Sequence, residues 1–151
     1  MTRLRSSFLA AALLVALPAA AQVTVTDPWI RGTVQGQMAT GAFMKLQSAK
    51  DARLVEAASP VAGVVEIHEM ALQNNVMRMR AVKALDLPAG RAVELKPGGY
   101  HVMLMDLKQQ MKEGETVPVT LVVESGGKRE TIEVKVPVRA PTARADMMKK
   151  H

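Results

Sequence analysis

Residues 116–139, TVPVTLVVESGGKRETIEVKVPVR, decide the fold class. Apolar side chains occupy every second position from Val117 to Val123 and again from Ile132 to Val138. A period of two is typical of β-strands that bury one face. The pair Gly126-Gly127 between the two runs predicts a tight turn. We therefore expect these residues to form a β-hairpin.

The same period of two recurs upstream. It is present in residues 63–68 and 100–105, and residues 40–46 also have the composition of a strand. Turn-forming residues separate these runs, at 73–75, 88–90, 96–99 and 113–115. No segment carries a convincing long amphipathic helical pattern. The sequence therefore predicts an all-β protein, an antiparallel β-sandwich.

The two ends of the chain differ from this pattern. Arg3 and Arg5 precede an apolar run that is short for a membrane span, and small residues follow it, so residues 1–21 are expected to be a signal peptide cleaved after Ala21. A retained anchor is the less favoured alternative, and the lack of a cysteine argues against lipidation. We expect one domain over residues 22–139 and a flexible tail over residues 140–151.

Composition excludes several classes of function. The 151 residues include no cysteine, so disulfides, thiolate nucleophiles and blue-copper centres are excluded. Removing Arg3 and Arg5 leaves 18 basic against 14 acidic residues, a net charge of about +4. This surplus is spread along the chain without interleaved aromatic residues, so we do not expect nucleic-acid binding. It could steer docking to an acidic partner.

Four residues stand out as candidate metal ligands: His68, Met79, His101 and Met103. Their spacing is His-x10-Met-x21-His-x-Met, and they include two of the three histidines in the chain. A thioether is a soft, neutral ligand that binds Cu(I) well and hard cations poorly. Two imidazoles and two thioethers would leave the positive charge of Cu(I) uncompensated, which suits holding and transferring the ion more than redox turnover.

Strand geometry indicates how the four could meet. If Asn74 and Asn75 form the loop of a hairpin, Met70 lies opposite Met79, and His68, Met70, Met77 and Met79 share one face. A slip of one residue would move Met79 to the other face. His101 and Met103 are two apart on one strand and must point the same way.

These residues and their surroundings resemble the PCuAC family of periplasmic copper chaperones. The shared segments are the complete four-residue motif, residues 65–70 (VEIHEM), residues 95–105 (LKPGGYHVMLM) and residues 27–31 (DPWIR). The resemblance extends over residues 22–139. It implies a cupredoxin-like Greek-key β-sandwich that binds Cu(I). It also implies delivery to the CuA site of cytochrome c oxidase subunit II, directly or with a Sco-type thiol protein.

Other methionines and acidic residues have different expected roles. Met70, Met77 and Met105 share a predicted face with the motif and are secondary candidates for copper contact. Met38, Met44 and Met111 are better explained as core residues. Glu66 and Glu69 are expected to be solvent-side residues or partners of an imidazole N–H. The tail residues Met147, Met148 and His151 repeat the soft-ligand chemistry and could capture a second copper ion, Cu(I) or Cu(II).

We therefore expect a copper carrier rather than an enzyme. The sequence has no cysteine nucleophile, no paired-carboxylate motif and no phosphate-binding glycine loop. The expected protein is a soluble periplasmic monomer that docks at a membrane-bound acceptor. Two alternatives remain open: a periplasmic copper buffer for resistance, and a secreted β-sandwich interaction module that binds no metal.

Overall fold

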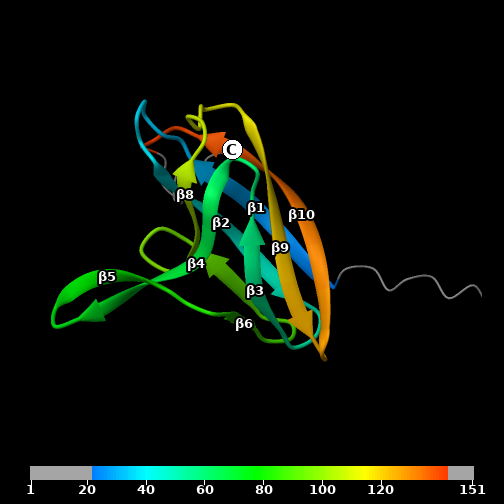
Figure 1. Ribbon diagram of the computed structural model, residues 1–151. Coiled ribbons are helices and arrows are strands. Elements are labelled where there is room, and N and C mark those ends of the chain that lie inside the picture. The colour runs from blue at the N-terminus through cyan, green and yellow to red at the C-terminus, as the bar shows by residue number, and fades with distance from the viewer. Residues whose placement is uncertain (1–21, 143–151) are drawn as a thin grey trace, which may run out of the picture.

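The computed structural model describes residues 22–142, which fold into ten β-strands (Figure 1). None of these residues belongs to a helix that is long and apolar enough to cross a membrane. The strands are β1 (Val23–Arg31), β2 (Ala39–Ser48), β3 (Ala52–Ala58), β4 (Ala62–Gln73), β5 (Val76–Ala81), β6 (Leu85–Leu87), β7 (Ala92–Leu95), β8 (His101–Leu107), β9 (Thr116–Ser125) and β10 (Lys128–Arg139).

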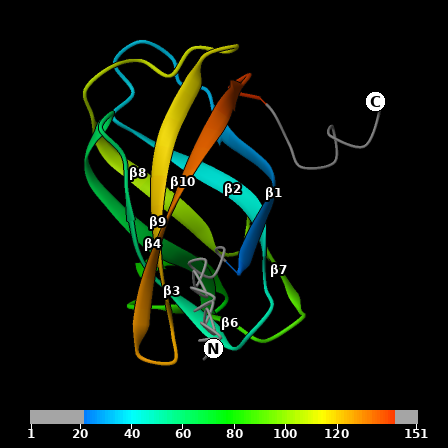
Figure 2. The ribbon, with the colours of Figure 1, turned by 90° about the vertical axis from the view of Figure 1, so that its right-hand side faces the viewer.

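The strands form two layers that are joined along one edge. One layer has the order β5-β4-β8-β2-β1, with β7 on the remaining length of β2, and the other has the order β10-β9-β3-β6. Figure 2 looks onto β9 and β10, with β8, β2 and β1 crossing behind them. The predicted all-β sandwich is confirmed. One pairing departs from the antiparallel expectation, because β1 and β10 join the layers in parallel through Ile30 and Val138.

The predicted hairpin of residues 116–139 is present as β9 and β10. Ser125 pairs with Lys128, and the two-residue loop between them has φ values of 57° at Gly126 and 75° at Gly127. Positive φ at both loop positions favours glycine and matches the twist of the flanking strands. The alternating residues Val117, Val119, Leu121 and Val123 are all buried, as the period of two predicts.

The main core lies between the two layers and draws on every strand except β5. Met44 and Met111 belong to it, as expected. The expectation for Met38 is wrong, because its side chain is 55% exposed. Met38 precedes the first residue of β2, so it does not occupy an inward-facing position of a strand.

The β4–β5 hairpin extends away from the body as an arm (Figure 1). Its loop residues, Asn74 and Asn75, have φ values of 50° and 63°, and Gln73 pairs with Val76 across them. Asparagine tolerates positive φ better than most residues, so this pair can form the tight turn. Met70 lies opposite Met79, which is the predicted register. β5 lies at the edge of its layer, and all six of its residues are exposed.

Candidate metal site

The two candidate histidines lie side by side on adjacent strands. His68 of β4 pairs directly with His101 of β8, and their ring centroids are 5.8 Å apart. His101 is the first residue of β8 and follows a turn in which Gly98 has a φ of 84°. Both side chains are largely removed from solvent, with 9% exposure at His68 and 4% at His101.

One nitrogen of each imidazole has a partner. His68 Nε2 lies 2.7 Å from a carboxylate oxygen of Glu66, and His101 Nδ1 lies 3.2 Å from the carbonyl oxygen of Gly99. Because a carboxylate and a carbonyl can only accept, these two nitrogens carry the protons in the neutral rings. The lone pairs are then on His68 Nδ1 and His101 Nε2.

Those two remaining nitrogens are buried and have no hydrogen-bond partner among the described residues. A buried polar atom without a partner costs free energy, so such atoms call for an explanation. A neutral imidazole with its N–H held by an acceptor is the usual form of a histidine metal ligand. The two free nitrogens therefore have the chemistry of a metal site.

The environment of His101 favours its neutral form. Burial lowers the pKa of His101 below its ordinary value of 6.5, and the nearby positive charges of Arg31 and of His68, when protonated, lower it further. The hydrogen bond to the Gly99 carbonyl opposes this trend. A metal ion must compete with a proton for an imidazole, so a lowered pKa keeps the ligand available at neutral pH.

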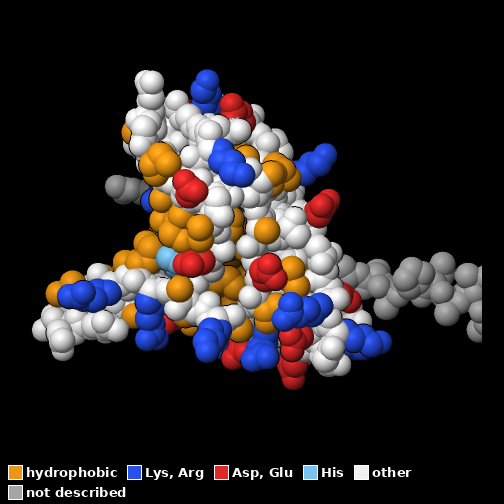
Figure 3. All heavy atoms as spheres, in the orientation of Figure 1, with side chains coloured by type: hydrophobic (Ala, Val, Ile, Leu, Met, Phe, Trp, Pro, Cys, Tyr) orange, Lys and Arg blue, Asp and Glu red, His pale blue; other side chains and the backbone are white. Residues whose placement is uncertain are grey.

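The methionines complete the cluster. Met70, Met79, His101 and Met103 line one hollow of about 320 Å³. Met103 is two residues from His101 on β8 and lies opposite Glu66, while Met79 reaches the hollow from β5. Met79 is 47% exposed, so the thioether side of the cluster is open to solvent. Figure 3 shows a histidine at the surface where the arm leaves the body, beside hydrophobic and acidic side chains.

An aromatic wall closes the cluster on the side of β1 and β2. Phe43 stacks on Trp29 at 4.6 Å between ring centroids and lies 6.2 Å from the His101 ring. Gly41 leaves room for this arrangement, because a Cβ there would come within 2.8 Å of the Phe43 ring. The guanidinium of Arg31 lies 5.5 Å from the Phe43 ring centroid, within range of a cation–π interaction, and Arg31 also lines the hollow.

The sequence did not identify Arg31, Gly41 or Phe43 as part of the site. Arg31 lies in the segment 27–31 that carries part of the family resemblance, but nothing local indicated that β1 and β2 would reach β8. The interpretation of Glu66 as a partner of an imidazole N–H agrees with its contact to His68. Glu69 instead pairs with Arg80 across the arm.

The other candidates are not brought into this cluster. Met105 lies two residues beyond Met103, opposite Ala39 and Val64, and does not line the hollow. Met77 shares the face of Met79 but lies farther out on the arm, opposite Leu72. Met147, Met148 and His151 lie outside the described residues, as does the expected signal peptide.

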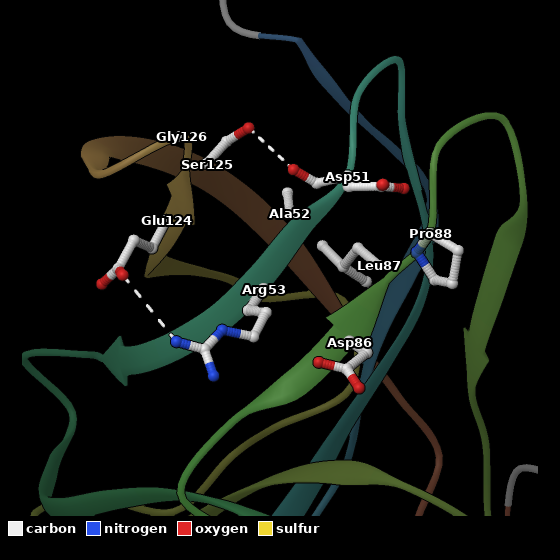
Figure 4. A pocket seen from close by; sticks show the side chains of 9 residues that line it. All are labelled: Asp51, Ala52, Arg53, Asp86, Leu87, Pro88, Glu124, Ser125 and Gly126. Atoms are coloured by element: carbon white, nitrogen blue, oxygen red, sulfur yellow. Dashed lines mark hydrogen bonds and ion pairs between the residues drawn. The ribbon is translucent and has the colours of Figure 1, made fainter.

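Another hollow, of about 400 Å³, lies between β3, β6 and the β9–β10 turn (Figure 4). Asp51, Arg53, Asp86 and Glu124 line it, and no histidine or methionine does. Its charged groups are already paired in part, since Arg53 lies 3.8 Å from Glu124. Among residues 22–142 no three His, Asp or Glu side chains gather into a potential metal cluster. The side chains that the candidate site offers are imidazoles and thioethers.

Residues 23–138 match the LpqE-like family, described as "Putative lipoprotein LpqE-like". The "Putative lipoprotein Lxx21020" of Leifsonia xyli subsp. xyli (strain CTCB07) is 34% identical over an alignment that covers 90% of this chain and 89% of that protein. "Uncharacterized protein RP573" of Rickettsia prowazekii (strain Madrid E) is 32% identical over an alignment that covers 80% of this chain and 69% of that protein.

Solved structures with this fold include copper-bound proteins. The copper-bound PCuAC domain from PmoF2 is 25% identical with a TM-score of 0.65, covering 82% of this chain and 97% of that domain. The solution structure of CuI-DR1885 from Deinococcus radiodurans is 33% identical with a TM-score of 0.60, covering 80% of this chain and 83% of that protein. The expected cupredoxin-like fold is thus confirmed. The chain is a member of the LpqE-like, PCuAC-type family.

Proposed function

We propose that this protein is an exported copper chaperone that binds Cu(I) through His68, Met79, His101 and Met103 and transfers it to an acceptor. The observation that carries the proposal is the pair of buried imidazole nitrogens on His68 and His101 that have no partner among the described residues. His101 lines one hollow with Met79 and Met103. The copper-bound structures of similar PCuAC-type proteins support it.

The donor set favours Cu(I) as the cargo. Thioethers are soft, neutral ligands that bind Cu(I) well and Cu(II) poorly, and neutral imidazoles are borderline ligands that also accept Cu(I). We infer that copper is the cargo rather than a catalytic cofactor, because the thioether donors favour the reduced ion. The proposed role is therefore that of a carrier and not of an enzyme.

The geometry also suits release. Met79 is half-exposed, so an acceptor could approach the ion from that side. The positive charge of Arg31, which lines the same hollow, lowers the affinity for a cation. An acceptor with thiolate ligands offers negative charge as well as soft sulfur, so transfer to it would be favourable.

We assign the acceptor and the location by family resemblance. The proposed acceptor is the CuA site of cytochrome c oxidase subunit II, reached directly or with a Sco-type thiol protein. The proposed location is the periplasm, after removal of residues 1–21, with the protein acting as a monomer that docks at a membrane-bound partner. Membership of a family described as lipoproteins supports export.

X-ray absorption on the Cu(I)-loaded protein, residues 22–151, tests the ligand set. The proposal expects two nitrogen and two sulfur neighbours, and the sulfur contribution should fall in Met79→Leu and in Met103→Leu. A copper coordination shell without sulfur would overturn the proposed ligand set.

A transfer assay then separates a chaperone from a buffer. Cu(I)-loaded protein is mixed with the apo soluble domain of the oxidase subunit, with and without a Sco-type protein, and the CuA absorption is followed. A chaperone should transfer Cu(I) to the oxidase domain faster than a small-molecule Cu(I) chelate at the same concentration does. If the protein transfers Cu(I) no faster than the chelate does, the result would favour the alternative function of a copper buffer.

A further inference from the structure

We propose that Met70, Met77 and Met79 form a second, all-thioether Cu(I) site on the arm, through which the ion enters and leaves the histidine site. The inference rests on the proposed function, because the arm site serves the same cargo. Met79 would belong to both sites, so that an ion could move between them without being released.

The register of the arm places the three sulfur-bearing side chains together. Met70 and Met79 are direct cross-strand partners, and the Cβ atoms of such partners are about 5 Å apart. Met77 lies two residues from Met79 on β5 and shares its face, at about 6.6 Å along the strand. Methionine has three rotatable side-chain bonds, so its sulfur can cover these separations.

Exposure increases along this series toward solvent. Met70 is half-buried, Met79 is 47% exposed and Met77 is 51% exposed. Met70 and Met79 both line the hollow that contains His101, so the inner end of the cluster adjoins the histidine site. Its outer end is free for an incoming ion or partner.

The two faces of the arm differ in charge. One face of the arm, the thioether face, carries Met70, Met77 and Met79. Within residues 68–81 the other side chains on this face are His68, Leu72 and Ala81, and none of the six carries a permanent charge. The cationic side chains Arg78 and Arg80 alternate with the methionines and occupy the opposite face, where Arg80 is held by Glu69. An approaching Cu(I) therefore meets neutral sulfur and not a guanidinium.

Packing does not account for sulfur at these positions. Within residues 22–142, β5 pairs with β4 alone and contributes nothing to the main core, so the side chains of Met77 and Met79 fill no interior space there. Apolar cross-strand contact could stabilise the hairpin, but leucine or valine would serve that purpose as well. What methionine adds is a soft ligand atom.

Movement between the sites is a ligand substitution. The thioether of Met77 or Met70 forms a bond to Cu(I) as an imidazole nitrogen leaves, while the bond to Met79 persists. The oxidation state of copper does not change, and the departing imidazole regains its free lone pair. No proton, electron or further reactant is required.

The first test follows the methionine methyl groups by NMR under anaerobic conditions. Cu(I) is diamagnetic, so methyl-13C-labelled protein, residues 22–151, can be titrated with Cu(I) beyond one equivalent. The proposal expects the Met79 and Met103 signals to shift with the first equivalent. The Met70 and Met77 signals should shift as the second equivalent binds, and the Met79 signal should then shift again, because its thioether is shared between the two ions. Met77 and Met70 signals that never move would overturn it.

The second test measures the rate of Cu(I) removal by a chromophoric chelator. Met77→Leu should slow removal several-fold, and Leu72→Met, which adds a thioether opposite Met77, should accelerate it. Met38→Leu is the matched control, since Met38 is also an exposed methionine but lies off the arm. Equal rates in all four proteins would overturn the arm site.

Failure of the proposed function can be distinguished from failure of the arm site. If the wild type takes up no Cu(I) at Met79 and Met103, the proposed function itself fails. The wild type could instead bind one ion at Met79 and Met103 while the Met77 signal does not move and Met77→Leu loses Cu(I) to the chelator at the wild-type rate. In that case only the arm site is wrong.

Discussion

At the scale of single residues, the site depends on which nitrogen of each histidine carries its proton. Glu66 fixes the proton of His68 on Nε2, and the Gly99 carbonyl fixes that of His101 on Nδ1. The first acceptor is a side chain and can be changed, whereas the second is backbone. Glu66 is therefore the residue through which the orientation of a candidate ligand can be tested.

Replacing Glu66 with alanine should weaken Cu(I) binding by about tenfold, because His68 loses the acceptor that orients its ring. Glu66→Gln should recover much of the affinity, since the amide oxygen can still accept the N–H. Competition with a chromophoric chelator measures both values. Equal affinities in the alanine variant and the wild type would exclude a role for Glu66.

His101 should make the stability of the copper-free protein depend on pH. Its pKa lies below 6.5 in the folded protein, so the unfolded chain binds the proton first as the pH falls. The free energy of unfolding should therefore decrease as the pH falls through the ordinary histidine pKa of about 6.5. Urea unfolding across this range measures the effect, which His101→Gln should reduce. If the free energy of unfolding of His101→Gln depends on pH as that of the wild type does, the predicted role of His101 is wrong.

At the scale of elements, the β4–β5 hairpin is the device that brings Met79 to the site. Its two asparagines adopt positive φ, and the register that follows places Met79 opposite Met70. A shift of one residue would turn the thioether of Met79 away. Since β5 pairs only with β4, the turn can be altered with little effect on the core.

The double substitution Asn74→Val/Asn75→Val should lower Cu(I) affinity while leaving the thermal unfolding midpoint nearly unchanged. β-branched residues are strained at positive φ, so the turn and its register would be lost. Asn75→Gly, which tolerates positive φ, serves as the control and should bind as the wild type does. Unchanged affinity in the valine variant would mean that Met79 is not a ligand.

The sequence predicts those parts of the fold and site that depend on local pattern. The β9–β10 hairpin follows from alternation and a glycine pair, and the register of the arm follows from Asn74 and Asn75. The parallel pairing of β1 with β10 and the aromatic wall of Trp29 and Phe43 join distant segments. The alternation of residues within one strand carries no information about contacts between distant segments, so the sequence did not predict these two features.

At the scale of the whole molecule, stability and binding are carried by different regions. The main core lies between the layers, whereas the histidines and the Trp29–Phe43 pair lie on the outer face of one layer. β9 contributes four buried core residues and no candidate ligand. Damage to that core should therefore lower stability without altering the site.

Leu121→Ala tests this separation. Leu121 is fully buried, so its truncation should cost about 3 kcal/mol of unfolding free energy. The folded fraction should retain wild-type Cu(I) affinity. Urea unfolding and chelator competition give the two quantities, with the exposed Met38→Ala as the control for stability. A parallel loss of affinity would show that core and site are coupled.

Copper binding in this protein depends on whether the two free imidazole nitrogens and the thioethers hold Cu(I). Anaerobic titration of residues 22–151 against a chromophoric Cu(I) chelator, beside the His101→Ala/Met103→Ala variant, tests it most directly. We expect one tightly held Cu(I) in the wild type and a loss or large weakening of binding in the variant. A wild type that does not compete with the chelator, or a variant that competes equally well, would contradict it.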